Sequence, residues 1–130
     1  ITVCRQTRHT VPLQAFQWVA FILPIFSLNY PDMFDYVGLF SAALNVQSAG
    51  QRNSPVYQDM DKKLAVQFEK APKLYWLGIG KDDFLYKNNA AYRADLDKKG
   101  YKYEFMETPG GHVWTCWRIY LSVFAPKLFK

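Results

Sequence analysis

The chain has 130 residues, 50% hydrophobic and 18% aromatic, which is enough for one modest core and too little for two. Its net charge of +5 is spread along the sequence without a basic cluster among the aromatic residues, so nucleic-acid binding is not expected. The two cysteines and two histidines lack the spacing of metal ligands, so no zinc site is predicted, and no cofactor is expected.

Residues 11–28 are largely apolar and follow a basic stretch, which gives them a superficial likeness to a secretory signal. Gln14, Gln17 and Pro24 interrupt the apolar run, and no small-x-small cleavage site follows it. The run is also marginal for a membrane helix, which needs about 20 apolar residues. Neither a signal peptide nor a membrane anchor is therefore expected from this segment.

Three strand-like runs follow along the chain. They are YVGLFSAAL at 36–44, KLYWLGIG at 73–80 and YKYEFME at 101–107. The first two are nearly continuous apolar sequence, as expected of strands buried on both faces of a parallel sheet, and the third alternates. Residues 45–55 are rich in polar and turn-forming residues and are predicted to form a loop.

Helical patterns alternate with these runs. They cover residues 57–70, 85–99 and 114–129, with Gly100 after two lysines as the end signal of the second. The order predicts right-handed crossovers and an α/β fold, with a parallel sheet flanked by helices on both faces. Because three strands leave an open hydrophobic edge, the chain is predicted to be the back half of a larger domain.

Acidic residues and a histidine follow the second and third predicted strands. Asp82 and Asp83 come after residues 73–80, and His112 follows the turn Pro109-Gly110-Gly111. Functional groups in open parallel sheets gather beyond the carboxyl ends of strands, so these groups are expected to meet. A histidine oriented by a carboxylate can take a proton from a serine hydroxyl. Asp83 is predicted to orient His112 and Asp82 to cap the next helix, with an exchange of these two roles as the alternative.

The sequence also predicts roles for three residues that follow His112, namely Trp114, Cys116 and Trp117. Trp114 is predicted to contribute to substrate binding, as a ring suited to sugar or aryl groups. Trp117, three residues on, is predicted to belong to the core. Cys116 is predicted to be a small packed residue rather than a nucleophile, because no basic partner is arranged for it.

Three strings resemble the esterase family of α/β-hydrolases, which includes feruloyl esterases, esterase D and mycolyltransferases. They are NYPDMFDYVGLFSA at 29–42, GIGKDDFLY at 78–86 and GGHVWTCWRIYLSVFAPKLF at 110–129. The likeness is strongest to carbohydrate esterase domains of gut Bacteroidetes type and covers Ser27–Lys130. It implies the C-terminal half of an α/β-hydrolase, serine-ester hydrolysis, Asp83 at the family's acid position and His112 at its histidine position. Full-length relatives of this type are commonly exported.

The family's nucleophile elbow is missing where the resemblance would place it. Members carry a string such as Ile-Ala-Gly-Leu-Ser-Met-Gly-Gly-Phe-His-Ser there, whereas residues 12–23 are PLQAFQWVAFIL. A back-translation of this segment, read from its third base, can encode IAGLSMGGFHS, with the serine codon straddling Phe16 and Gln17. The hypothesis that follows is that residues 1–26 are translated out of frame and residues 27–130 are the C-terminal part of the esterase domain.

The resemblance implies a serine esterase that acts on acyl groups of carbohydrates, such as feruloyl or acetyl esters of plant xylan. Its partner would be a small-molecule or polysaccharide ester. Because the nucleophilic serine and the elbow N–H are absent from the sequence, we expect the chain as written to be inactive. The alternatives are a fragment without function, which we rank next, and a non-catalytic remnant that binds glycans through Trp114.

Overall fold

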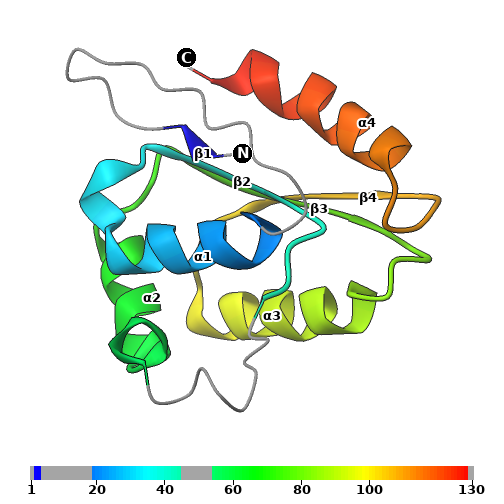
Figure 1. The fold of residues 1–130 in the computed structure, drawn as a ribbon. Coiled ribbons are helices and arrows are strands. Elements are labelled where there is room, and N and C mark those ends of the chain that lie inside the picture. Colours follow the sequence, from blue (N-terminus) through cyan, green and yellow to red (C-terminus); the bar gives the residue numbers. More distant parts are fainter. Residues whose placement is uncertain (1, 4–18, 45–53, 129–130) are drawn as a thin grey trace.

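The computed structural model describes residues 2–3, 19–44 and 54–128, which form a four-stranded sheet in the order β1-β2-β3-β4 (Figure 1). The strands are β1 (Thr2–Val3), β2 (Tyr36–Phe40), β3 (Leu74–Gly80) and β4 (Glu104–Thr108). The last three run parallel to one another, and β1 pairs antiparallel with the first two residues of β2.

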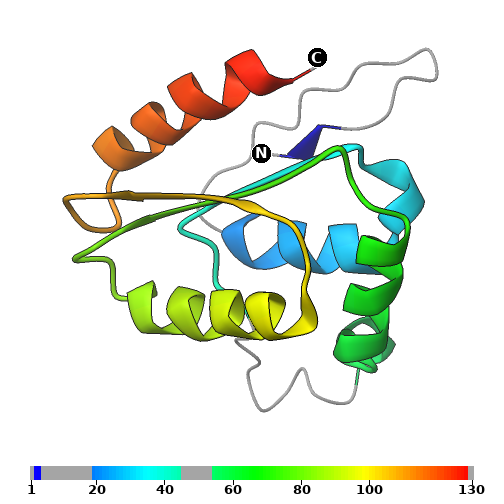
Figure 2. The same cartoon turned by 180° about the vertical axis from the view of Figure 1, so that it is seen from behind.

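Helices cover both faces of the sheet. They are α1 (Val19–Asn29), α2 (Met60–Glu69), α3 (Tyr86–Lys99) and α4 (Trp114–Phe124), with short 3-10 turns at Pro31–Met33, Pro55–Tyr57 and Ala125–Lys127. Of the helices that the structure describes, α1, α2 and α3 lie on one face and α4 lies on the other, as the view from behind also shows (Figure 2). None of the helices in the described ranges is long and apolar enough to cross a membrane.

The predicted parallel sheet flanked by helices is confirmed, with shifts at several ends. The first parallel strand ends at Phe40 rather than residue 44, because Ser41 turns the chain with a left-handed φ of 48°. The third begins at Glu104 rather than residue 101. The last helix ends at Phe124, and a 3-10 turn containing Pro126 follows it. The predicted loop at 45–55 falls mostly outside the described residues.

Alternating side chains of the parallel strands form two cores. On one face, Val37, Leu39, Tyr75 and Leu77 pack against buried side chains of α1, α2 and α3. On the opposite face, a more aromatic cluster joins the sheet to α4. Its buried members are Tyr36, Trp76, Cys116, Tyr120 and Phe124. Both faces of β3 are therefore buried, which accounts for its nearly continuous apolar sequence.

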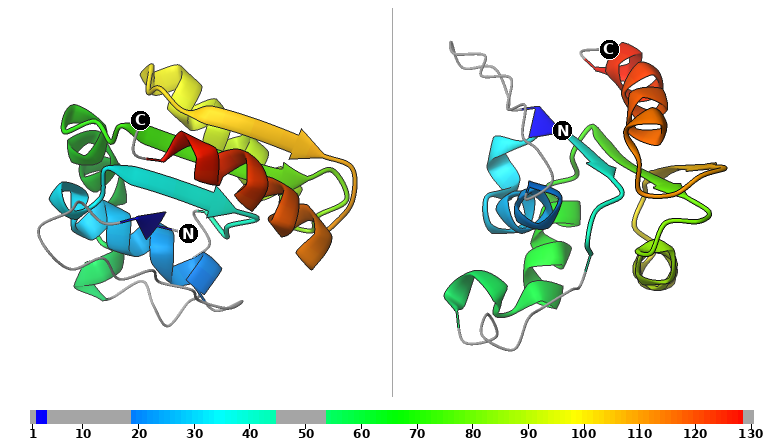
Figure 3. Two further views of the ribbon diagram at one scale, coloured as in Figure 1. Left: turned by 90° about the horizontal axis from the view of Figure 1, so that it is seen from above. Right: turned by 45° about the vertical axis from the view of Figure 1, so that its right-hand side comes forward.

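Glycines on the α4 face let this helix approach the sheet closely, and Figure 3 shows α4 lying across the sheet. A Cβ atom on Gly38 would lie 2.8 Å from the ring of Phe124, and one on Gly78 would lie 2.9 Å from the ring of Tyr120. Real Cβ atoms do not come this near to other heavy atoms. The absence of side chains here thus makes room for the aromatic residues of α4.

The absence of a side chain at Gly80, the last residue of β3, lets the loop after β4 approach the sheet closely. A Cβ atom there would overlap the carbonyl oxygen of Gly110. Two backbone bonds join the loops: Lys81 donates its N–H to the Thr108 carbonyl at 2.9 Å, and Asp82 donates to the Gly110 carbonyl at 3.0 Å. The loops that carry the acidic residues and His112 are therefore packed as one unit.

This packing makes Gly80 the most sensitive glycine for the position of these loops. We expect Gly80→Ala to lower the free energy of unfolding by about 1–3 kcal/mol, because a backbone carbonyl cannot swing aside as a side chain can. Urea unfolding followed by tryptophan fluorescence measures the change. Ala91→Ser, at an exposed position of α3, is the control and should stay within about 0.5 kcal/mol of the parent. An equally small effect of Gly80→Ala would contradict the prediction.

Candidate active site

The side chains of Asp83 and His112 meet beyond the carboxyl ends of β3 and β4. His112 Nδ1 lies 3.0 Å from Asp83 Oδ2. The two residues are 29 positions apart in sequence, and they meet because neighbouring parallel strands end at the same edge of the sheet. An ionised carboxylate can only accept a hydrogen bond, so beside it a neutral imidazole carries its proton on Nδ1 and has a lone pair on Nε2.

Asp83 is buried, and each of its carboxylate oxygens has a partner. Its side chain is 0% exposed, and Oδ1 accepts the backbone N–H of Leu85 at 2.9 Å. Such contacts offset the cost of burying a charge. Asp82 is exposed, and its backbone N–H bonds the loop of His112. The capping role before α3 is predicted for Asp82, but the side chain that accepts a backbone N–H there is that of Asp83. No side chain caps the helix at Leu85 itself.

Glycine geometry and several contacts fix the loop that carries His112. Gly110 has a φ of 102°, a conformation that other residues rarely adopt, and Val113 donates its N–H to the Gly111 carbonyl at 2.9 Å. The thiol of Cys116 donates a weak hydrogen bond to the Pro109 carbonyl at 3.5 Å. Cys116 is buried, in agreement with its predicted packing role.

A hydroxyl pair ties the end of β4 to α4. Thr108 Oγ1 and Tyr120 Oη are 2.7 Å apart, and both residues are buried. Burial is the largest cause that raises the pKa of Tyr120, to about 12, and the hydrogen bond with Thr108 lowers it in part. The tyrosine therefore stays neutral at physiological pH and can keep this contact with the strand that leads to His112.

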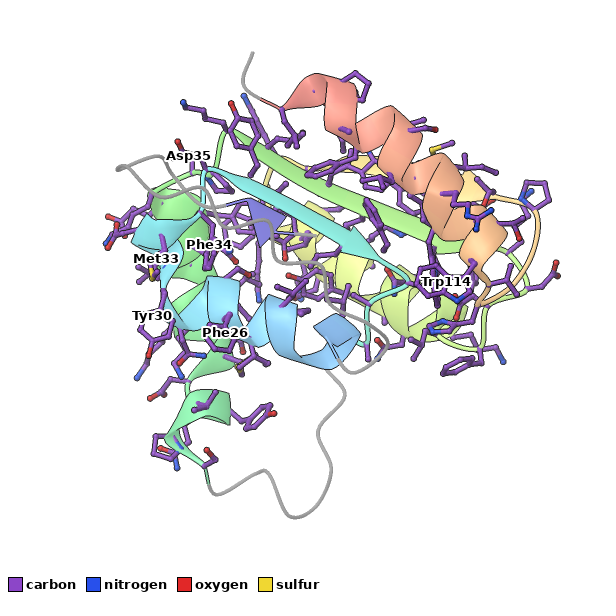
Figure 4. The ribbon with its side chains drawn as sticks, turned by 45° about the horizontal axis from the view of Figure 1, so that its top comes forward. Phe26, Tyr30, Met33, Phe34, Asp35 and Trp114 are labelled. Carbon is purple, nitrogen blue, oxygen red and sulfur yellow. The ribbon has the colours of Figure 1, made fainter. Side chains whose placement is uncertain are left out.

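Two aromatic residues contact the imidazole of His112, and a third packs on one of them. Phe84 lies with its ring centroid 4.8 Å from that of His112, and Trp117 lies at 5.0 Å in a nearly perpendicular arrangement. Trp114 packs on Trp117 at 5.0 Å and is 58% exposed. Figure 4 shows Trp114 at the start of α4, far from the exposed group Phe26, Tyr30 and Met33 on the other side of that view.

Two hydroxyls at strand ends near this site are already bonded. Ser41, directly after β2, is fully buried, and its Oγ accepts the indole N–H of Trp117 at 3.1 Å. Its left-handed backbone costs about 1–2 kcal/mol in an L-residue. Thr108 is occupied with Tyr120. Ser41 has a strained backbone after a strand, but neither hydroxyl is exposed as the serine of a nucleophile elbow is.

Metal coordination has no candidate among the residues that the structure describes, where no three His, Cys, Asp or Glu side chains form a group suited to an ion. The arrangement that is present is an acid-oriented imidazole with aromatic neighbours and partial access to solvent, since the side chain of His112 is 14% exposed. Its chemistry is proton transfer at Nε2.

The sequence had singled out Asp83, His112 and Trp114, and the structure brings the first two into contact. It had not singled out Phe84 or Ser41, and it had assigned Trp117 to the core alone. Phe84 follows Asp83 directly, so its place could have been inferred from the acid. The contact between Ser41 and Trp117 spans 76 positions and carries no local sequence signal.

Comparison with solved structures relates the fold to known hydrolases. A ferulic acid esterase superposes with a TM-score of 0.59 at 20% identity, over 77% of this chain and 44% of that protein. S-formylglutathione hydrolase of Staphylococcus aureus gives 0.62 at 21% identity, over 84% and 47%. The fluorophosphonate-binding serine hydrolase F of Staphylococcus aureus gives 0.61 at 24% identity, over 80% and 49%. The chain thus spans less than half of each of these proteins, and its fold is part of an α/β-hydrolase.

A search of curated proteins found no match. The family model Esterase, described as "Putative esterase", matches residues 25–128, which is most of the chain and includes Asp83 and His112. The chain belongs to this esterase family.

Proposed function

We propose that the chain is a fragment of a serine carboxylic-ester hydrolase and carries the acid and the histidine of its catalytic triad. The observation that supports this most directly is the contact of 3.0 Å between the buried carboxylate of Asp83 and Nδ1 of His112. Family membership supports the same class of chemistry. In this proposal Asp83 is the orienting acid, and Asp82 takes no part in the reaction.

The proposed mechanism is proton transfer by Nε2 of His112. A serine hydroxyl placed beside Nε2 would lose its proton to the imidazole while its oxygen attacks the ester carbonyl. The resulting imidazolium would be stabilised by Asp83 and would then protonate the departing alcohol. Water would then attack the acyl group and lose its proton to Nε2, and the imidazolium would return a proton to the serine oxygen as the carboxylic acid is released.

The proposed substrates are acyl esters of carbohydrates, with feruloyl or acetyl esters of xylan as examples. Two exposed rings near His112, Phe84 and Trp114, support a substrate with an aromatic or sugar ring, because such rings stack on aromatic faces. One of the structural relatives is a ferulic acid esterase, which is compatible with this class of substrate. The name of another, S-formylglutathione hydrolase, points to a different ester, so the alcohol and acyl groups are part of the proposal.

The missing serine is explained by our hypothesis that residues 1–26 are out of frame. The family match supports it, since the match begins only at residue 25. The segment PLQAFQWVAFIL at 12–23 supports it as well, because a shifted reading of possible codons yields the expected elbow. Residues 12–18 of this segment lie outside the described part of the structure.

Sequencing the DNA that encodes the chain tests this hypothesis directly. We expect the shifted frame to encode a Gly-x-Ser-x-Gly elbow upstream of Ser27, with the frame restored near that residue. The proposed chemistry needs a serine on a strand-to-helix turn, and a shift of reading frame alone would leave the codons for it in the DNA. A shifted frame without such a serine would sink the hypothesis.

The chain as it stands is expected to have no appreciable esterase activity. In a comparable triad, loss of the serine costs a factor on the order of 10⁶ in turnover, and loss of the histidine costs about the same. Hydrolysis of p-nitrophenyl acetate should therefore be no faster with the parent chain than with His112→Ala. Hydrolysis that depends measurably on His112 would contradict the assignment of an absent nucleophile.

The orienting role of Asp83 can be tested without turnover. We expect Asp83→Asn to remove the proton from Nδ1 of His112, because an asparagine amide can donate to that nitrogen and favour the other tautomer. Nitrogen-15 NMR of the imidazole distinguishes the tautomers. Asp82→Asn is the matched control and should leave the imidazole signals unchanged. The opposite pattern would assign the orienting role to Asp82.

A second candidate function is glycan binding without turnover, favoured by the exposure of Trp114 beside the site. Titration with xylo-oligosaccharides, followed by tryptophan fluorescence, distinguishes the two functions. A saturable change in the parent that is lost in Trp114→Ala would support the binding remnant.

A further inference from the structure

Trp117 contacts His112 from a direction that Asp83 does not control. The centroids of the two rings are 5.0 Å apart and their planes cross at 87°. Asp83 holds the imidazole at one atom, Nδ1. A ring held at one atom and at its own Cβ can still tilt, and a tilt moves Nε2, the atom that would take the proton. The contact with Trp117 opposes this movement.

Trp117 is itself held in place by a polar contact. Its indole N–H donates to Ser41 Oγ at 3.1 Å, so the first turn of α4 is bonded to the end of β2. Phe84 also contacts the imidazole, but its side chain is a hydrocarbon and the residue is 75% exposed. Of the two rings on His112, Trp117 is therefore the one fixed by a directional bond.

Ser41 is built into the sheet in an unusual way. It is fully buried, its φ is 48°, and its backbone N–H donates to the Gly78 carbonyl of β3 at 2.8 Å. A residue with a side chain is disfavoured in this conformation and persists only where its surroundings hold it. The strained backbone and the hydroxyl bond occur in the same residue, at the edge of the sheet from which the loops of Asp83 and His112 leave.

We propose that Trp117 is a positioning residue for His112, and that Ser41 acts through it by fixing the indole. This inference rests on the proposed function, since it concerns the orientation of the base. The two side chains would keep Nε2 directed toward the serine hydroxyl whose proton it would take. Simple core packing is the competing explanation, because Trp117 also borders the aromatic cluster of Tyr120 and Phe124.

The test compares Trp117→Phe and Ser41→Gly in the nitrogen-15-labelled chain. Trp117→Phe keeps a ring and removes the N–H, whereas Ser41→Gly removes the hydroxyl and suits the positive φ. The measurement is the exchange rate of the Nδ1 proton of His112 and its tautomer. We expect exchange to be roughly tenfold faster in both variants, the change that corresponds to about one net hydrogen bond.

Ser122→Gly is the matched control. Ser122 lies on the exposed side of α4, and its hydroxyl bonds the Ile119 carbonyl in the same helix. A glycine there weakens α4 without touching the contact between Ser41 and Trp117. Urea unfolding measures how much stability the control loses. If its Nδ1 proton still exchanges at the parent rate, faster exchange in the other two variants reflects positioning and not loss of stability.

Two results would overturn the proposal. One is a Nδ1 proton that exchanges at the parent rate in both Trp117→Phe and Ser41→Gly. The other is equally fast exchange in Ser122→Gly, which would assign the effect to stability. Should Trp117→Phe fail to fold, Ser41→Gly decides the matter, because glycine fits its backbone. If Asp83→Asn leaves the tautomer of His112 unchanged, the proposed function fails. If Asp83→Asn changes the tautomer while Trp117→Phe and Ser41→Gly leave the exchange rate unchanged, only the positioning role fails.

Discussion

The close approach of two segments to the glycines of β3 is the constraint on which the candidate site depends. Gly78 makes room for the ring of Tyr120 from α4, and Gly80 makes room for the carbonyl of Gly110. Because both glycines are on one strand, helix α4 and the His112 loop are seated against the same surface. Asp83 lies three residues after the end of that strand, and its carboxylate is within hydrogen-bonding distance of the imidazole.

Much of this arrangement could be predicted from the sequence, because it follows from local pattern and strand direction. The apolar run at 73–80 identified a strand buried on both faces, and its end placed Asp83 in a loop. The glycine pair before His112 identified a tight turn after the next strand. Parallel neighbours end at one edge, so the meeting of the two side chains needed no knowledge of tertiary packing.

The remaining features depend on contacts between distant segments. Nothing near Ser41 in the sequence indicates a left-handed residue or a bond to Trp117, and a spacing of three between tryptophans suits both core packing and a site. The short strand Thr2–Val3 was also unexpected, since it lies in the segment predicted to be out of frame. Strand ends were misplaced by a few residues where turns, rather than hydrophobicity, decide them.

The hydroxyl pair between Thr108 and Tyr120 has a consequence for any titration of this fold. A tyrosine whose pKa is near 10 when unfolded and about 12 when folded contributes stability that is complete below pH 10 and is lost as the pH rises toward 12. Between neutral pH and pH 10 the Tyr120 hydroxyl therefore stays protonated and keeps its hydrogen bond with Thr108. Ionisation of Tyr120 is therefore not a cause of any change in the imidazole over that interval.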